Sequence, residues 1–208
     1  MQEPLHIRTV HPSERWEHSR SLLQMHHDRK RVFVDRLGWR LPTGAGWLEV
    51  DEFDNDRAIY FLVHSDEHEH LGSLRLLPTT SRHMLPAIFS QLCPDGTPVG
   101  EDVWEISRFL AAPDGSSGTA ILRIYRLLAA ALIQFAELNG VSRFILVAES
   151  KRMPALLAIG WEVLPLSLPT LVNGELIEAA EIKVSDAKAC AAQSRKGAVE
   201  RPRLEAAA

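Results

Sequence analysis

Cysteine and long apolar runs are scarce in this sequence of 208 residues. Its two cysteines, Cys93 and Cys190, stand far apart, so they do not form a disulfide framework, and a reducing compartment is the simpler expectation. The N-terminal segment has no basic stretch followed by an apolar one, so we do not expect a secretory signal. The longest apolar run, around Leu127–Phe135, is shorter than the roughly 20 residues that cross a bilayer, and it predicts a buried helix. We therefore expect a cytoplasmic protein with no membrane partner.

An excess of positive charge is also missing. The chain has 23 Lys and Arg against 27 Asp and Glu, a formal charge of −4, whereas nucleic-acid binding generally needs a basic surface. Nucleic acid is therefore not expected as a partner. A chain of this length buries about 70% of its unfolded surface and forms one domain by default, so we predict a single domain over residues 1–186. Residues 187–208 lack apolar periodicity, and we predict a flexible tail there.

Alternating strand and helix patterns predict an α/β protein. Ser13, followed by Glu14 and Glu17, marks a helix start, and apolar spacing carries this helix to about Arg36. A loop that contains Pro and Gly is predicted over 38–56. The order of strand, helix and strand after residue 103 indicates a sheet covered by helices. Further strands are predicted at 57–64, 71–77, 103–110, 143–147, 161–166 and 179–184, and further helices at 83–92, 120–139 and 151–159.

Several charged side chains lie inside apolar runs, where burial costs several kcal/mol per ion unless the ion is paired. Arg75 stands between leucines, and Glu105 and Arg108 alternate with aliphatic and aromatic residues. Three arginines and three nearby acids could neutralise one another and form the walls of a rigid polar cleft. Such a cleft suits a zwitterionic or cationic small molecule. The residues concerned are Arg29, Arg75 and Arg108 with Glu49, Asp51 and Asp54.

Glu105 and Arg108 are three residues apart on a predicted strand, which sends their side chains to opposite faces unless the strand bulges. Bulged strands are often found beside active sites. The alternative is an edge strand with both groups in water, and the flanking Trp104 and Phe109 argue against it.

Two other patterns have simple interpretations. His64, His68 and His70 lie within a hydrophilic segment that reads as a hairpin turn, so we predict a solvated turn and no metal site. The acidic run from Glu49 to Asp56 lacks the residue order of a calcium loop. Glu52 is expected to be solvated, as any acid in such a loop could be.

The ordered spacing of the charged and aromatic residues resembles that of the acyl-homoserine-lactone synthases, the LuxI-type autoinducer synthases of bacterial quorum sensing. The resemblance covers roughly residues 5–185. It implies a single-domain, three-layer α/β/α sandwich similar to the N-acetyltransferase fold, with a mixed central sheet. The pattern reads R-x3-F-x5-W from Arg29, E-x-D-x2-D from Glu49, Arg75 in G-x2-R-L-L-P-T, E-x2-R from Glu105, and continues through Met84, Leu85, Phe89, Gly160 and Trp161.

The family reaction joins S-adenosylmethionine to an acyl thioester, carried by acyl carrier protein or coenzyme A, and releases 5′-methylthioadenosine with an N-acyl-homoserine lactone. No cofactor is expected, since S-adenosylmethionine is a substrate. The resemblance makes Glu105 the candidate general base, acting through water, and gives Arg108 an anchoring role. Phe33 and Trp39 could be core residues by themselves, but the resemblance places them on the S-adenosylmethionine side, where aromatic faces attract a sulfonium. The residues matching the S-adenosylmethionine side or its ion-pair network are Arg29, Phe33, Trp39, Glu49, Asp51, Asp54 and Arg75.

The sequence says less about the residues that would bind the acyl thioester. Backbone amides around Ser107–Phe109 could stabilise the oxyanion, and the acyl chain is expected near Phe89 and Leu146. The basic residues Arg143, Lys151 and Arg152 could dock an acidic carrier protein, with a solvated helix start as the alternative. The sequence Gly118-x-Ala120 is the end of a pyrophosphate-binding loop, but Gly115 stands where Arg or Gln belongs. An acyl-coenzyme A donor therefore stays open.

Two other functions remain open at this stage. One is an N-acyltransferase that uses acyl-coenzyme A and a different amine, which an intact pyrophosphate loop would favour. The other is a non-catalytic sensor of S-adenosylmethionine or an acyl ligand, which loss of Glu105 or Arg108 would favour. Both residues are present, so the synthase accounts for more of the sequence.

Overall fold

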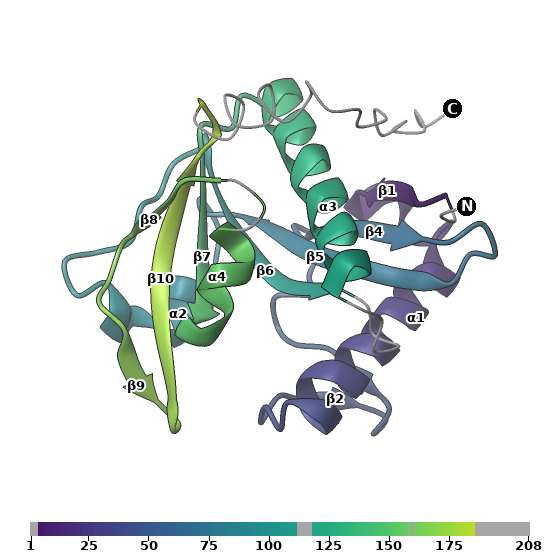
Figure 1. The fold of residues 1–208 in the computed structure, drawn as a ribbon, viewed down its shortest axis with the longest axis horizontal. Coiled ribbons are helices and arrows are strands. Elements are labelled where there is room, and N and C mark those ends of the chain that lie inside the picture. The colour runs from purple at the N-terminus through teal and green to yellow at the C-terminus, as the bar shows by residue number, and fades with distance from the viewer. Residues whose placement is uncertain (1–3, 112–117, 158, 160, 186–208) are drawn as a thin grey trace. The chain divides into compact units, whose positions relative to one another are not determined.

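The computed structural model describes residues 4–111, 118–157, 159 and 161–185. These residues form two compact units, each built from separate stretches of the chain. The first unit contains residues 4–76, 108–111 and 118–128, and the second contains the other described residues. Strands β5 (His70–Pro78) and β6 (Val103–Ala111) and helix α3 (Gly118–Asn139) each contribute to both units (Figure 1). The predicted tail at 187–208 lies outside the described residues.

The first unit is built on an antiparallel sheet. Strand β4 (Ile59–His64) is entirely buried and pairs with β1 (His6–Val10) on one side and β5 on the other. The pairing of β4 with β5 is irregular between Val63 and His64. Strands β4 and β5 fall where the sequence predicted them, whereas β1 was not predicted.

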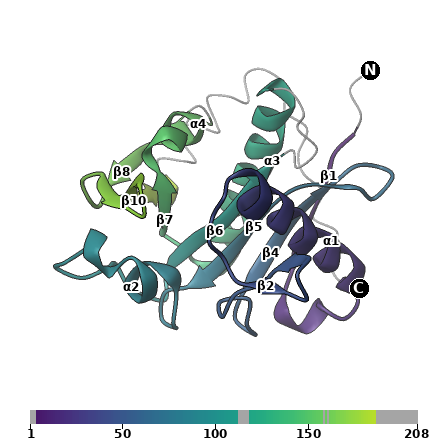
Figure 2. The same cartoon turned by 90° about the horizontal axis from the view of Figure 1, so that it is seen from below.

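Helix α1 (Ser19–Arg29) lies against one face of this sheet in both views (Figures 1 and 2). The sequence predicted one helix from Ser13 to about Arg36; its start was wrong, but the helical run does end at Arg36. Ser13 belongs to a separate 3-10 turn, η1 (Pro12–Glu14), because the Glu14 carboxylate accepts the His11 N–H at 2.9 Å and closes the turn. Beyond α1 the chain continues as a π-helical segment, η2 (Lys30–Arg36).

The predicted loop at 38–56 contains a small hairpin of β2 (Thr43–Gly44) and β3 (Leu48–Glu49). Close packing elsewhere in the first unit depends on Gly72 of β5. A Cβ atom at Gly72 would lie 2.5 Å from Cγ2 of Ile124 and 3.0 Å from the carbonyl oxygen of Leu110. A side chain at this position would therefore separate β5 from α3 and the end of β6.

The second unit has a mixed sheet. Strand β7 (Arg143–Glu149) runs parallel to β6 over four residue pairs, from Val103 opposite Arg143 to Ile106 opposite Leu146. On its other side β7 pairs antiparallel with β10 (Glu175–Lys183) along its whole length. Two short strands, β8 (Val163–Pro165) and β9 (Thr170–Val172), also pair with β10, and β9 was not predicted.

Short helices complete the second unit. The predicted helix at 83–92 is present as α2 (Met84–Ile88) and the 3-10 turn η3 (Ser90–Leu92). The predicted helix at 151–159 is present as η4 (Ser150–Arg152) and α4 (Met153–Leu157), and α4 lies beside β7 in both views (Figures 1 and 2). The parallel β6–β7 pair among antiparallel partners is the mixed sheet that the sequence predicted.

Helix α3 is the longest helix described, and by length and composition it could cross a membrane. Core helices of soluble proteins meet the same criterion, so this is weak evidence for a membrane span. Its residues Leu128 and Leu132 are fully buried, and Trp104 of β6 packs edge-on against Phe135 with ring centroids 5.3 Å apart. These contacts agree with the prediction of a buried helix.

Candidate active site

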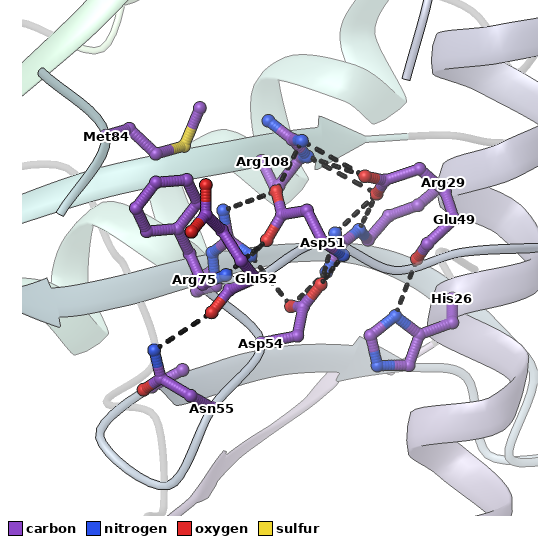
Figure 3. Close-up of polar contacts among 12 residues, drawn as sticks. His26, Arg29, Glu49, Asp51, Glu52, Asp54, Asn55, Arg75, Met84 and Arg108 are labelled. Atoms are coloured by element: carbon purple, nitrogen blue, oxygen red, sulfur yellow. Dashed lines mark hydrogen bonds and ion pairs between the residues drawn. The ribbon is translucent and has the colours of Figure 1, made fainter. Parts of the chain in front are cut away.

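Three arginines and three acids of the first unit form a closed ring in which positive and negative side chains alternate (Figure 3). All six side chains are buried, and no more than 7% of any of them is exposed. Such pairing removes the cost of burying each charge alone. In order, the contacts are Arg29 with Glu49, Glu49 with Arg108 at 3.0 Å, Arg108 with Asp51 at 2.6 Å, Asp51 with Arg75 at 2.5 Å, Arg75 with Asp54 at 2.9 Å, and Asp54 with Arg29 at 2.8 Å.

The ring connects five parts of the chain. Arg29 is the last residue of α1, Glu49 ends β3, Arg75 lies in β5 and Arg108 in β6. Asp51 and Asp54 come from the turn after β3. That turn is fixed by its own side chains, because Asp54 accepts the Asp51 N–H and Asp51 accepts the Phe53 N–H, both at 2.9 Å. The six residues that the sequence singled out as mutually neutralising are therefore brought together.

Two of the ion pairs are bidentate. Arg29 donates to both oxygens of Asp54, at 2.8 and 3.0 Å, and Arg75 donates to both oxygens of Asp51, at 2.5 and 3.1 Å. This planar geometry adds orientation as well as energy. The Arg75 guanidinium also lies 5.7 Å from the centre of the Phe53 ring.

The ring controls the ionisation of its members. Burial alone raises the pKa of the Asp54 carboxyl, but Arg29 and Arg75 outweigh burial and hold that pKa far below its ordinary value. Burial alone lowers the pKa of Arg29, but Asp54 and Glu49 outweigh it and raise that pKa. For Arg108, burial and the neighbouring Arg29 and Arg75 lower the pKa. Among Arg29, Asp54 and Arg108, Arg108 is thus the one whose pKa moves in the direction that disfavours its charged form.

The backbone at Arg108 is also unusual. Its φ of 52° is in the left-handed region, which costs a side-chain-bearing residue about 1–2 kcal/mol. The left-handed conformation of Arg108 interrupts the extended backbone of β6. The sequence analysis needed such an irregularity for Glu105 and Arg108 to share a face of the strand. Strained backbone of this kind is found preferentially at functional sites.

Two contacts to the ring come from residues that the sequence analysis missed. The Tyr60 hydroxyl donates to Oδ1 of Asp54 at 2.8 Å, and burial together with the Asp54 charge raises the Tyr60 pKa. His26 Nδ1 lies 2.8 Å from the Glu49 carbonyl oxygen, and burial together with Arg29 lowers the His26 pKa. Their only sequence signals were a tyrosine in a buried strand and a histidine one turn before Arg29.

Phe33 and Trp39 stack on each other, with ring centroids 4.8 Å apart and an angle of 6° between the ring planes. Phe33 lies in η2, where the helix has π geometry, a feature that is frequent at functional sites. Both rings pack with Val32, Leu37 and Leu110 in an apolar cluster of the first unit. Trp39 keeps part of its surface exposed.

In the second unit, Glu105 is buried and its two carboxylate oxygens accept the N–H groups of Met84 and Leu85, each at 2.7 Å. These are the first two amides of α2, which have no partner within the helix. Glu105 therefore fixes the start of α2.

The residues predicted for the acyl side are divided between the units. Phe89 and Leu146 belong to the second unit: Phe89 packs against an apolar cluster, and Leu146 is buried on β7 between Ile106 and Ala180. Ser107 is half-buried on β6. Phe109 belongs to the first unit, where its ring lies 4.8 Å from that of Tyr125. The candidate pyrophosphate loop lies largely outside the described residues.

The three cations predicted to dock a carrier protein are all in ion pairs within the second unit. This pairing reduces the positive charge that they present to a partner. The docking role that the sequence suggested for this basic group stays a prediction. The pairs are Arg143 with Glu181 at 3.2 Å, Lys151 with Glu175 at 2.8 Å, and Arg152 with Glu149 at 2.7 Å.

Of the three histidines in the β4–β5 segment, His68 lies exposed in the turn, as the sequence predicted. His64 and His70 are buried instead. His70 Nδ1 lies 2.8 Å from Oδ2 of Asp28, and burial with the neighbouring His70 lowers the His64 pKa to about 4. Among the described residues, no group of three or more His, Cys, Asp or Glu side chains could hold a metal ion.

Comparison with known proteins identifies the family of this chain. Residues 13–192 match the family model described as "Autoinducer synthase". An acyl-homoserine-lactone synthase of Ralstonia nicotianae is 33% identical over 177 residues, which cover 83% of this chain and 86% of the relative. Another, of Ralstonia solanacearum, is 40% identical over 124 residues, but the match spans 57% of this chain and only 60% of that relative.

The fold is shared with solved structures. The coenzyme A-dependent acyl-homoserine lactone synthase BjaI, solved with S-adenosylmethionine and isopentyl-coenzyme A, superposes with a TM-score of 0.81 at 24% identity. The superposition covers 97% of this chain and 96% of that chain, and it confirms the predicted α/β fold. With the match over residues 13–192, the chain belongs to the autoinducer synthase family, whose relatives compared above are acyl-homoserine-lactone synthases.

Proposed function

We propose that this protein synthesises an N-acyl-L-homoserine lactone from S-adenosyl-L-methionine and an acyl thioester. The α-amino nitrogen attacks the thioester carbonyl, an amide bond forms, and the carrier leaves as a free thiol. The methionine carboxylate then attacks its own γ-carbon, the carbon–sulfur bond breaks, and 5′-methylthioadenosine leaves with the electron pair. The products are the lactone, the thiol and 5′-methylthioadenosine, and the amine releases one proton to a base.

The observation that carries this proposal is the closed ring of Arg29, Glu49, Arg108, Asp51, Arg75 and Asp54. The ring is electrically neutral as a whole and its side chains are buried, so it holds α1, β5 and β6 of the first unit in fixed positions. A rigid wall of fixed dipoles can orient a zwitterion without reorganising when it binds. The family match supports the same substrate.

The stacked pair of Phe33 and Trp39 suits the sulfonium of S-adenosylmethionine. A cation over an aromatic face gains about 0.5–2 kcal/mol. Trp39 has part of its surface exposed and is held flat by Phe33 behind it. In this proposal Arg108, fixed by Glu49 and Asp51, anchors a substrate carboxylate or keeps the acids in place.

Glu105 is the proposed general base. Its carboxylate is held in place by the Met84 and Leu85 amides, and a carboxylate placed in this way can take the ammonium proton through a water. Backbone amides around Ser107–Phe109 are proposed to stabilise the oxyanion of the tetrahedral intermediate. In this scheme direct attack proceeds without an acyl-enzyme intermediate.

The acyl thioester is proposed to bind the second unit near Phe89 and Leu146. Its carrier is acyl carrier protein or coenzyme A. The solved BjaI structure contains isopentyl-coenzyme A, which supports a coenzyme A donor for that relative. The paired state of Arg143, Lys151 and Arg152 gives an acidic carrier protein less positive charge to recognise. The expected location is the cytoplasm, where both donors occur.

The experiment that tests this function has two arms. Organic extracts of a bacterium that expresses the chain are analysed by mass spectrometry for the homoserine-lactone fragment ion, against an empty-vector control. Purified protein is then assayed for 5′-methylthioadenosine release with a panel of acyl thioesters. A new lactone together with 5′-methylthioadenosine release supports the proposal. An acyl amide without 5′-methylthioadenosine release indicates an N-acyltransferase with another amine instead.

A further inference from the structure

Arg15 of the first unit contacts the residues that lead into strand β4. It lies in the turn between η1 and α1, and its Nη2 donates one hydrogen bond to the carbonyl oxygen of Asn55 and another to that of Ala58, the latter at 2.7 Å. Asn55 itself closes the loop, since its carbonyl oxygen also accepts the Ala58 N–H at 3.0 Å. Arg15 therefore fixes the backbone two residues before Tyr60.

The same guanidinium contacts the Tyr60 side chain. Its Cζ atom lies over the aromatic ring, 5.2 Å from the centroid. A planar guanidinium is attracted to an aromatic face and can still donate its N–H groups to acceptors in its own plane. Tyr60 is 1% exposed, so its ring has little freedom to move away from Arg15. Arg15 thus determines the position of Tyr60 through both its backbone and its ring.

Tyr60 in turn contacts the ring of arginines and acids. Its hydroxyl donates to Oδ1 of Asp54 at 2.8 Å, the same oxygen that accepts Nη1 of Arg29. The terminal torsion of an aspartate has a broad distribution, so a hydroxyl held in one place selects one orientation of the carboxylate. Figure 3 shows Asp54 oriented toward Arg29 and Arg75, the two arginines with which it pairs.

We infer that Arg15 is a positioning residue for S-adenosylmethionine binding, and that it acts through Tyr60 on the orientation of Asp54. This inference rests on the proposed function, in which the ring orients that substrate. Arg15 is not a member of the ring, and its guanidinium is already engaged by two carbonyl oxygens and an aromatic face. Its loss therefore weakens the binding of S-adenosylmethionine and leaves the binding of the acyl thioester unchanged.

The test uses the purified full chain and three variants: Arg15→Met, Tyr60→Phe and the two combined. Isothermal titration calorimetry gives Kd for S-adenosylmethionine, and each single variant is expected to raise it about tenfold, the equivalent of one hydrogen bond to a charged group. The combined variant is expected to raise Kd about as much as either single one, because both changes act through one hydroxyl. Independent contacts would multiply to about a hundredfold, and that result overturns the inference.

Steady-state 5′-methylthioadenosine release separates positioning from general damage. We expect kcat at saturating substrates and KM for the acyl thioester to stay within about twofold of the parent, since only substrate binding in the first unit is altered. A purely structural role would lower the stability of the variants and leave Kd of the folded protein unchanged. Tyr60→Phe keeps the packed ring, so it tests the inference by itself if Arg15→Met does not fold.

Arg57→Met is the matched control, because it removes the same charge from an exposed position of the same loop. Its Kd is expected to stay within about twofold of the parent, as for most surface substitutions. An equal increase in Arg57→Met and Arg15→Met, or an unchanged Kd in Tyr60→Phe while the parent forms lactone, overturns this inference alone. A parent protein that neither binds S-adenosylmethionine nor forms lactone overturns the proposed function, and this inference with it.

Discussion

The Arg29 guanidinium holds the Asp54 carboxylate through two parallel hydrogen bonds, Nη1 to Oδ1 at 2.8 Å and Nη2 to Oδ2 at 3.0 Å. Asp54 also accepts hydrogen bonds from the Tyr60 hydroxyl and the Asp51 backbone, and it pairs with Arg75. One carboxylate thus joins α1, β4 and β5 of the first unit. Removing the charge of Asp54 is therefore the most direct test of the ring.

Asp54→Asn is expected to lower the free energy of unfolding by about 3–5 kcal/mol, because it leaves Arg29 and Arg75 buried without their shared counter-ion. Urea denaturation of the two proteins at pH 7 measures the difference. Glu52→Gln is the matched control, since Glu52 is exposed in the same turn and its replacement is expected to change stability by less than about 0.5 kcal/mol. Equal stabilities for Asp54→Asn and Glu52→Gln contradict a cooperative ring.

The members of this ring could be predicted from the sequence, but their pairing could not. Arg75 lies in an apolar run, and a buried charge requires a partner, so its involvement follows from sequence alone. Which acid it contacts depends on where the turn after β3 places Asp51 and Asp54, and that turn is fixed by side-chain to backbone bonds. Tyr60 and His26 were missed for the same reason, because their contacts are made only in the folded chain.

The helices and strands were likewise predicted in part from the sequence. Strands β4, β5 and β6 are rich in aliphatic and aromatic residues and were predicted within two residues of their observed ends. Strand β1 was missed because its five residues, HIRTV, do not have a distinct apolar pattern. The helix start at Ser13 was wrong because the local capping signal of Glu14 closes a single turn and does not continue into α1. The local sequence therefore identified the turn but did not predict where the helix itself begins.

Trp39→Leu is expected to weaken S-adenosylmethionine binding by roughly three- to thirtyfold, the loss of a cation–aromatic contact of about 0.5–2 kcal/mol. Trp39→Phe retains an aromatic face and is expected to lose less. Isothermal titration calorimetry measures both affinities. Trp16→Leu serves as the control, because Trp16 is 88% exposed and far along the chain from the stack. If Trp39→Leu and Trp39→Phe lose affinity equally, the interaction is packing and not attraction of a cation.

Glu105→Gln is expected to reduce turnover by about 10²–10⁴-fold, the usual contribution of a general base. An amide accepts the Leu85 or Met84 N–H through one oxygen only, so the variant also loses one bond to α2, at a cost of about 1 kcal/mol. Steady-state 5′-methylthioadenosine release measures turnover, and urea denaturation measures the loss of stability. A stability loss without a loss of turnover assigns Glu105 to the support of α2 alone.

Stability is expected to depend on His64 in mildly acidic solution. The folded pKa of His64 is about 4, below the ordinary value of 6.5, because burial and His70 disfavour its charged form. The unfolded chain therefore binds this proton first, so stability is complete above about pH 6.5 and decreases as the pH falls toward 4. His64→Gln is expected to flatten this part of the curve of unfolding free energy against pH. His68→Gln, at an exposed position of the same segment, should leave the curve as it is in the parent protein.

The paired cations of the second unit offer the last test, which concerns the carrier. Lys151 is exposed and pairs with Glu175, which is itself 51% exposed. If acyl carrier protein docks here, Glu175 competes with it for Lys151. Glu175→Gln is then expected to lower KM for acyl carrier protein thioesters a few-fold at low ionic strength, and Lys151→Gln to raise it. Both effects should disappear at high salt, because exposed charges are screened, and neither should occur with the same acyl group on coenzyme A. Unchanged KM values in both variants place the docking surface elsewhere.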